Sequence, residues 1–182
     1  MFRVLKWCSV AVIGVLAVLA TIGFALPPKY HVERSISIAA DTEKIHELVG
    51  DLRQWPRWTR WQSLDPTLKV VYGERTNGVG ARQAWNGSTG NGELIFTKCD
   101  CDTGVTYSLF FDRGWQKSLG EILYSPSGDE TTVTWSMSGD FGLNLPRRFV
   151  GMMMRPKIEE VFDNGLRRLK QEAEAPEPAS TE

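Results

Sequence analysis

The chain opens with a purely apolar run and continues with a longer region in which apolar and polar residues alternate. The opening run extends from Trp7 to Pro28 and contains no charged residue. A helix that crosses a bilayer needs about 20 mostly apolar residues, so this run is long enough for one such helix. We therefore predict an N-terminal transmembrane anchor over residues 1–28, inserted through residues 4–26. Because proline cannot continue a helix, Pro27 and Pro28 should end it.

Charged residues on either side of this run predict its orientation. Arg3 and Lys6 precede it, and positive residues tend to stay on the cytoplasmic side, although Lys29 and Arg34 follow it. We predict a single-pass membrane protein with a cytoplasmic N-terminus and an extracytoplasmic, periplasmic domain. The alternative is a signal peptide cleaved after the small residues of Gly23-Phe24-Ala25. The run exceeds the roughly 7–15 residues of a signal core, which favours the anchor. Either alternative places the domain outside the cytoplasm.

The alternating region predicts one strand, one helix and then a series of strands. Residues 32–38 form the first strand, and the helix starts near Asp41, where negative charge suits a helix N-terminus. Pro56 ends this helix or starts a short second one. Beyond it the apolar period becomes two, with Gly, Asn and Asp between segments, which is typical of an antiparallel meander. The predicted strands cover residues 68–73, 79–86, 92–99, 104–111, 115–124 and 130–138.

A long helix and a polar tail complete the predicted organisation. The helix starts at Pro146 and carries an apolar stripe, and Pro156 should kink or split it. The final segment, 173–182, is rich in Glu, Ala and Pro and should be disordered. Residues 29–172 are enough for one domain with its own core, and too few for two.

Five motifs accompany this order of elements. They are Arg34–Ala40, Asp51–Trp58, Gly80–Gly87, Thr132–Trp135 and Phe162–Lys170. In order and spacing they are similar to motifs of the START/Bet v 1-like (SRPBCC) superfamily, and within it to the bacterial polyketide cyclase/dehydrase-like lipid-transport group. The resemblance implies an α+β helix-grip fold, in which a curved antiparallel sheet of about seven strands wraps round the C-terminal helix. It also implies a ligand cavity between sheet and helix. Because this fold carries binding proteins, sensors and a few enzymes, the resemblance does not choose the function.

Aromatic and methionine residues are the candidates for lining that cavity. Trp58 and Trp61 share a three-residue spacing with Trp55, which keeps them near one side of a helix. Alternating strand positions should face the helix, and the flexible run Met152–Met154 suits a cavity gate. The alternative for all of them is ordinary core packing. The predicted ligand-binding residues are Trp58, Trp61, Trp85, Tyr107, Leu109, Trp135, Met137 and Met153.

Charge and composition limit the other chemistry. The net charge of −1 argues against nucleic acid as a partner, because phosphate binding needs a basic face. We predict no metal, cofactor or catalytic residue, since the only histidines are His31 and His46 and neither adjoins a cysteine in the sequence. The Cys99-x-Cys101 pair is interpreted as two small structural residues, with a redox-labile pair as the alternative.

Two further features of the polar residues bear on the site. His46 is predicted on the surface, although relatives in the resembled family often have an aromatic residue there. Arg147 and Arg148 are interpreted as solvated, with an anionic headgroup as the alternative partner.

Three hypotheses about function follow from these observations. The leading one is a membrane-anchored protein that binds an apolar or lipid-like small molecule in the cavity. The first alternative is an interaction or structural module whose own side chains fill the cavity. The second is a cyclase/dehydratase-type enzyme, which would need polar residues such as Arg82, Glu93, Tyr107 and Glu121 to point inward.

Overall fold

A computed structural model describes residues 2–59, 61, 65–88, 90–111 and 116–176, without the side chains of residues 2–6, 8–11, 16 and 116. The helices are α1 (Phe2–Ala25), α2 (Thr42–Val49), α3 (Trp55–Trp58) and α5 (Leu145–Ala173). The strands are β1 (Lys29–Ile38), β2 (Lys69–Tyr72), β3 (Arg82–Gly87), β4 (Gly90–Asp100), β5 (Gly104–Phe111), β6 (Gln116–Ser127) and β7 (Glu130–Asp140).

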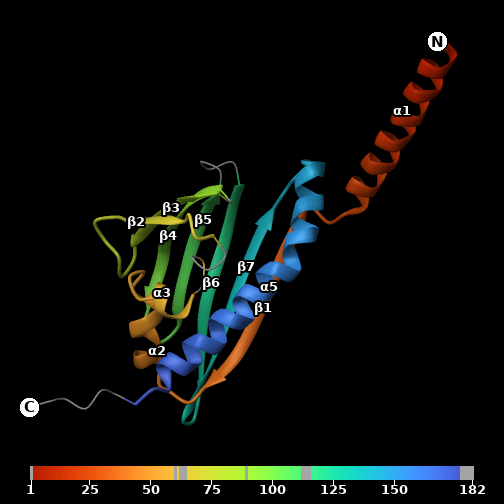
Figure 1. Cartoon of the computed structure of the whole chain (residues 1–182). Helices are drawn as coiled ribbons and strands as arrows, with labels where there is room; N and C mark the ends of the chain where they lie inside the picture. Colours follow the sequence, from red (N-terminus) through yellow and green to blue (C-terminus); the bar gives the residue numbers. More distant parts are fainter. Residues whose placement is uncertain (1, 60, 62–64, 89, 112–115, 177–182) are drawn as a thin grey trace, which may run out of the picture.

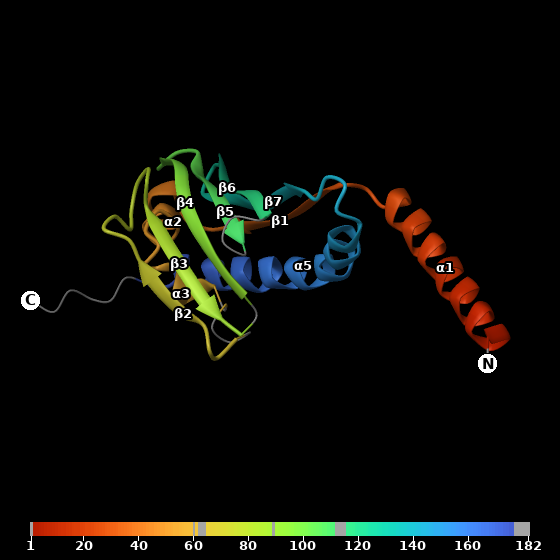
Figure 2. The ribbon, with the colours of Figure 1, turned by 90° about the horizontal axis from the view of Figure 1, so that it is seen from above.

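The strands form one antiparallel sheet in the order β1-β7-β6-β5-β4-β3-β2. β2 to β7 follow one another as a meander. β1 pairs with β7 and forms the edge strand of the sheet, with Lys29 opposite Asp140. The sheet curves round α5, as Figures 1 and 2 show. The predicted α+β helix-grip architecture is confirmed. β3 starts three residues later than predicted, because Gly78 and Gly80 turn the chain with φ values of 70° and 84°.

α5 is a single helix that bends near its middle, where Pro156 removes a backbone donor. Its second half packs on the sheet through Phe162, Leu166 and Leu169, which are all buried. Its first half turns away along the end of β7, and Val150 and Met152–Met154 are exposed there. The helix includes buried Ala173, one residue beyond the predicted end of the domain. Residues 177–182 of the predicted tail lie outside the described residues.

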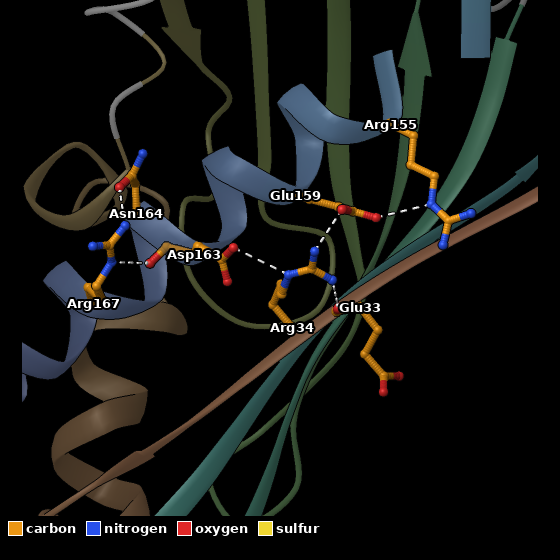
Figure 3. Close-up of polar contacts among 7 residues, drawn as sticks. All are labelled: Glu33, Arg34, Arg155, Glu159, Asp163, Asn164 and Arg167. Atoms are coloured by element: carbon orange, nitrogen blue, oxygen red, sulfur yellow. Dashed lines mark hydrogen bonds and ion pairs between the residues drawn. The ribbon is translucent and has the colours of Figure 1, made fainter. Parts of the chain in front are cut away.

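Charged side chains orient the second half of α5 on β1 (Figure 3). Arg34 of β1 lies with Nη2 2.7 Å from a carboxylate oxygen of Glu159 and with Nε 3.3 Å from one of Asp163. Arg155 also pairs with Glu159, at 3.0 Å. The hydrogen bond from Arg155 and then the charge of Arg34 lower the pKa of Glu159. Because these groups face water, their ion pairs add little to the stability of the helix. Their main effect is to fix its orientation on β1.

α1 projects away from the sheet, and its last turn contacts the start of α5 (Figures 1 and 2). Gly23 leaves so little room that a Cβ atom there would lie 3.1 Å from Leu145 and from Phe149. Among the residues that the structure describes together with their side chains, which leave out much of the first half of α1, no helix is long and apolar enough to cross a membrane.

Arg148 joins α1 to the domain. Its side chain is buried and donates to the carbonyl oxygens of Gly23 and Leu26, at 3.2 and 3.0 Å, and to that of Gly142, at 2.9 Å from Nε. A positive charge at this point also complements the C-terminal end of the α1 dipole. Our prediction of a solvated Arg148 was therefore wrong, because local sequence does not reveal that its neighbours are free carbonyl groups.

Candidate functional site

The side chains that point from the sheet toward α5 become more accessible toward the end of the sheet nearest α1. Along β5, Val105 is fully buried whereas Leu109 is 8% exposed, and Phe111 is half-buried. Along β7, Trp135 is 1% and Met137 is 8% exposed. β3 ends at this end of the sheet with half-buried Trp85. The end near α2 and α3 is therefore the more deeply buried, and we call it the closed end of the grip. At the end nearest α1, which we call the open end, Leu109 and Met137 are still buried, and Trp85 and Phe111 are half-buried.

Aromatic side chains fill the closed end. Trp135 stacks on Phe162 of α5 with ring centroids 4.2 Å apart, and Trp58 meets Trp135 edge-on at 5.2 Å. The indole Nε1 of Trp135 donates to the hydroxyl of Tyr107 at 2.7 Å. Trp55 packs on both Trp58 and Tyr107. The structure thus brings Trp58, Tyr107 and Trp135 together, as a continuous core.

The other predicted ligand-binding residues lie at or outside the open end. Leu109 and Met137 lie on the inward face one step beyond the aromatic core. Trp85 contacts Phe111 edge-on at 5.8 Å at the rim. Trp61 is exposed, and Met153 is 72% exposed on the first half of α5. The structure therefore separates these eight residues into core, rim and surface.

Two open hollows also occur on the described surface, and none of the eight residues lines them. One, of about 920 Å³, lies near α1, where β1 and β6 begin and β7 ends, and Lys29, Lys117 and Arg147 contribute positive charge to it. Its wall includes Tyr30, whose hydroxyl lies 2.6 Å from that of Ser118. The other, of about 520 Å³, lies beside α2 and the end of β4.

The polar cluster that an enzyme would need inside the grip is not formed by Arg82, Glu93, Tyr107 and Glu121. Glu121 lies on β6 between Gly120 and Ile122, which are buried toward the core, so it points to the other face of the sheet. Arg82 and Glu93 form an ion pair with each other, and the Arg82 side chain is exposed to solvent. Tyr107 is buried, which raises the pKa of its hydroxyl, and it is hydrogen-bonded to Trp135 instead. Among the described residues, no group of three or more His, Cys, Asp or Glu could hold a metal ion.

A different polar cluster, which the sequence did not reveal, lies beside the second hollow. His46 of α2 lies at the surface, as predicted, but it is half-buried there and contacts Cys99 and Tyr124, which was not predicted. The only signal in the sequence is the departure of His46 from the aromatic residue common in the resembled family. The partners of His46 come from distant strands, and local spacing cannot indicate them.

Comparison with known proteins places this architecture in a family. The family described as "Polyketide cyclase / dehydrase and lipid transport" matches residues 29–174, which include every strand and all but the first helix. The chain belongs to this family. For a polyketide cyclase/dehydrase and lipid transport protein, the seven-stranded grip round a C-terminal helix is the expected fold, and the predicted superfamily is confirmed. A search of curated proteins finds no match.

Solved structures agree with this fold at low sequence identity. Protein CV1439 from Chromobacterium violaceum is 11% identical, with a TM-score of 0.57 over 83% of this chain and 100% of its own. The Aha1 dimer from Colwellia psychrerythraea is 15% identical, with a TM-score of 0.59 over 82% and 99%. Mll3558 from Rhizobium loti is 18% identical, with a TM-score of 0.57 over 79% and 96%. At these identities the likeness establishes the fold alone.

Proposed function

We propose that this polyketide cyclase/dehydrase and lipid transport family member is a membrane-anchored binding protein for an apolar, lipid-like small molecule. The ligand lies at the open end of the grip, against Leu109 and Met137, with Trp85 at the rim. The observation that carries this proposal is the rise in exposure of inward apolar side chains toward the end of the sheet nearest α1. A ligand of this kind gains its affinity from the burial of apolar surface.

The N-terminal segment supports the membrane part of the proposal. Its 24-residue helix would be about 36 Å long at 1.5 Å per residue, against about 30 Å of bilayer hydrocarbon. The charge-free run from Trp7 to Pro28 includes exposed Val12, Ile13 and Leu19. In the proposed arrangement residues 4–26 cross the bilayer, the N-terminus is cytoplasmic and the domain is periplasmic. The open end of the grip then faces the membrane surface, where apolar ligands are concentrated.

Native mass spectrometry of the full-length protein, purified from its host membrane in a mild detergent, tests this proposal. We expect one apolar molecule to remain bound at near-stoichiometric occupancy. Met137→Gln keeps the side-chain length and adds a polar group, so it should weaken binding by about tenfold, which corresponds to about 1.4 kcal/mol. Met137→Leu should keep the ligand.

The matched control is Val71→Thr, because Val71 is exposed on β2 and Val→Thr likewise makes an apolar side chain polar at nearly constant size. This variant should retain wild-type occupancy. A wild-type protein that carries no molecule and ignores added lipid extract would contradict the proposal. That outcome would favour the second candidate, an interaction module, for which the packed aromatic core of Trp58, Tyr107 and Trp135 is the supporting observation.

A further inference from the structure

The hollow of about 520 Å³ lies at the end of the sheet away from α1, on the opposite side of the core from the proposed ligand site. It is lined by α2 and the turn after it, by the loop at Asn77–Gly78 and by the end of β4. His46, Cys99 and Cys101 all line it. This hollow therefore exposes two thiols and one imidazole.

A β-bulge turns the thiol of Cys99 toward α2. The register between β4 and β5 shifts between Phe96 and Lys98. Before the shift, Leu94 and Phe96 are the buried residues of β4, and beyond it the less exposed side chain is that of Cys99. One extra residue reverses which alternate positions face inward. Without it, Lys98 would occupy the inward position.

The contacts of Cys99 resemble those of an activated nucleophile. Its Sγ lies 3.5 Å from Nε2 of His46, and Nδ1 of the same ring lies 3.3 Å from the hydroxyl of Tyr124. The Tyr124 ring meets the imidazole edge-on, with centroids 6.0 Å apart. A nucleophile, a base within hydrogen-bonding distance and a third group that orients the base make up the arrangement used in nucleophilic catalysis.

We propose that Cys99 is a nucleophilic thiol that exchanges with small neutral or cationic disulfides, with His46 as its general base. The charge of the hollow selects the reagent. Glu47, Asp51 and Asp100 line it, and its lining includes no Lys or Arg among the described residues. An anionic disulfide is therefore repelled, whereas a neutral or cationic one is admitted.

The exchange needs only groups that line the hollow or contact it. Burial raises the pKa of Cys99 and lowers that of His46, so thiol and imidazole are both neutral at rest. As Sγ attacks one sulfur of a disulfide R–S–S–R, the thiol proton passes to Nε2 of His46. The S–S bond breaks, and the leaving thiolate takes up that proton and departs as RSH. The products are a Cys99–S–S–R mixed disulfide and one thiol. The charge of Asp100 favours the imidazolium formed on the way.

The reaction of the full-length protein with uncharged 4,4′-dithiodipyridine tests this site, in a Cys8→Ser background that leaves Cys99 and Cys101 as the only thiols. Mass spectrometry of the mixed disulfides gives the rate at each cysteine. Cys99 should react about tenfold faster than Cys101, since Cys99 is the one hydrogen-bonded to an imidazole. His46→Gln should slow Cys99 by about 10²-fold and leave the rate at Cys101 unchanged.

Two further measurements separate general-base assistance from a merely structural contact. Tyr124→Phe keeps the ring and removes the hydroxyl. It should therefore lower the reaction rate of Cys99 less than His46→Gln does. Anionic 5,5′-dithiobis(2-nitrobenzoate) should react more slowly with Cys99 than the neutral reagent does, by a wider margin than at Cys101. The proposal is overturned if folded His46→Gln protein reacts at Cys99 as fast as the parent, or if Cys101 is the faster thiol. None of these results depends on whether the grip binds a lipid.

Discussion

Replacement of Trp135 by alanine should lower the free energy of unfolding of the domain by about 3–5 kcal/mol. The indole is 1% exposed and stacks on Phe162, so its removal leaves a cavity between the sheet and α5. It also removes the donor at 2.7 Å from the buried hydroxyl of Tyr107. Both effects act at the closed end of the grip. The neighbouring rings there come from three elements and have little freedom to move into the cavity.

Denaturant unfolding followed by circular dichroism measures this loss. Trp135→Phe should lower the free energy of unfolding less than Trp135→Ala does, because phenylalanine fills most of the volume of the indole. It loses mainly the hydrogen bond, which is worth about 0.5–1.5 kcal/mol. Trp61→Ala is the matched control, since Trp61 is exposed and its removal should change stability by less than about 1 kcal/mol. A Trp135→Ala protein as stable as the Trp61→Ala protein would show that the aromatic cluster is not the core.

Arg148→Met should loosen the junction between α1 and the domain and lower the free energy of unfolding by about 2–3 kcal/mol. The guanidinium is buried and donates to the carbonyls of Gly23, Leu26 and Gly142. Methionine keeps much of the apolar stem but donates to none of them. The carbonyl groups then lose their partner, at Gly23 in a buried position, and the end of α1 is no longer held to α5.

Limited proteolysis of the full-length protein in detergent, together with thermal unfolding, checks this expectation. Tryptic cleavage after Lys29, at the junction, should become several times faster in Arg148→Met, and the melting temperature should fall. Lys157→Met removes a positive charge from an exposed position of the same helix and should change neither quantity. If both variants behave like the wild type, Arg148 does not hold the junction.

These two predictions concern opposite ends of the proposed binding surface. Trp135 closes the grip at the end where α3 and the second half of α5 pack on the sheet. Arg148 fixes where α1 leaves the domain, next to the open end of the grip, where Leu109 and Met137 are each 8% exposed. The proposed ligand site therefore lies between the buried aromatic core and the junction with α1, which is the proposed membrane anchor. Variants at Trp135 should act on stability first, and variants at Met137 on ligand occupancy first.

The amino-acid sequence by itself determined the elements and their order. Alternation of period two, interrupted by Gly, Asn and Asp, located the strands of the meander, and the bounds of β5 agree with the prediction residue for residue. Pro146 correctly marked the start of α5 to within one residue, and of the two alternatives for Pro56 the start of a short second helix is confirmed by α3. These features are local, because backbone periodicity and turn chemistry depend on residues only a few positions apart.

The tertiary structure decided which side chains are core, rim or surface. Trp58 and Trp61 belong to one three-residue pattern, yet Trp58 is buried against Trp135 and Trp61 is exposed. The bulge in β4 brings Cys99 to His46, 53 residues away in the chain, and the fold places Arg148 against carbonyls more than 120 residues earlier. Contacts between distant segments decide which side chains are buried and which residues they contact. A pattern that repeats every two or three residues carries no information about which segment will lie opposite it.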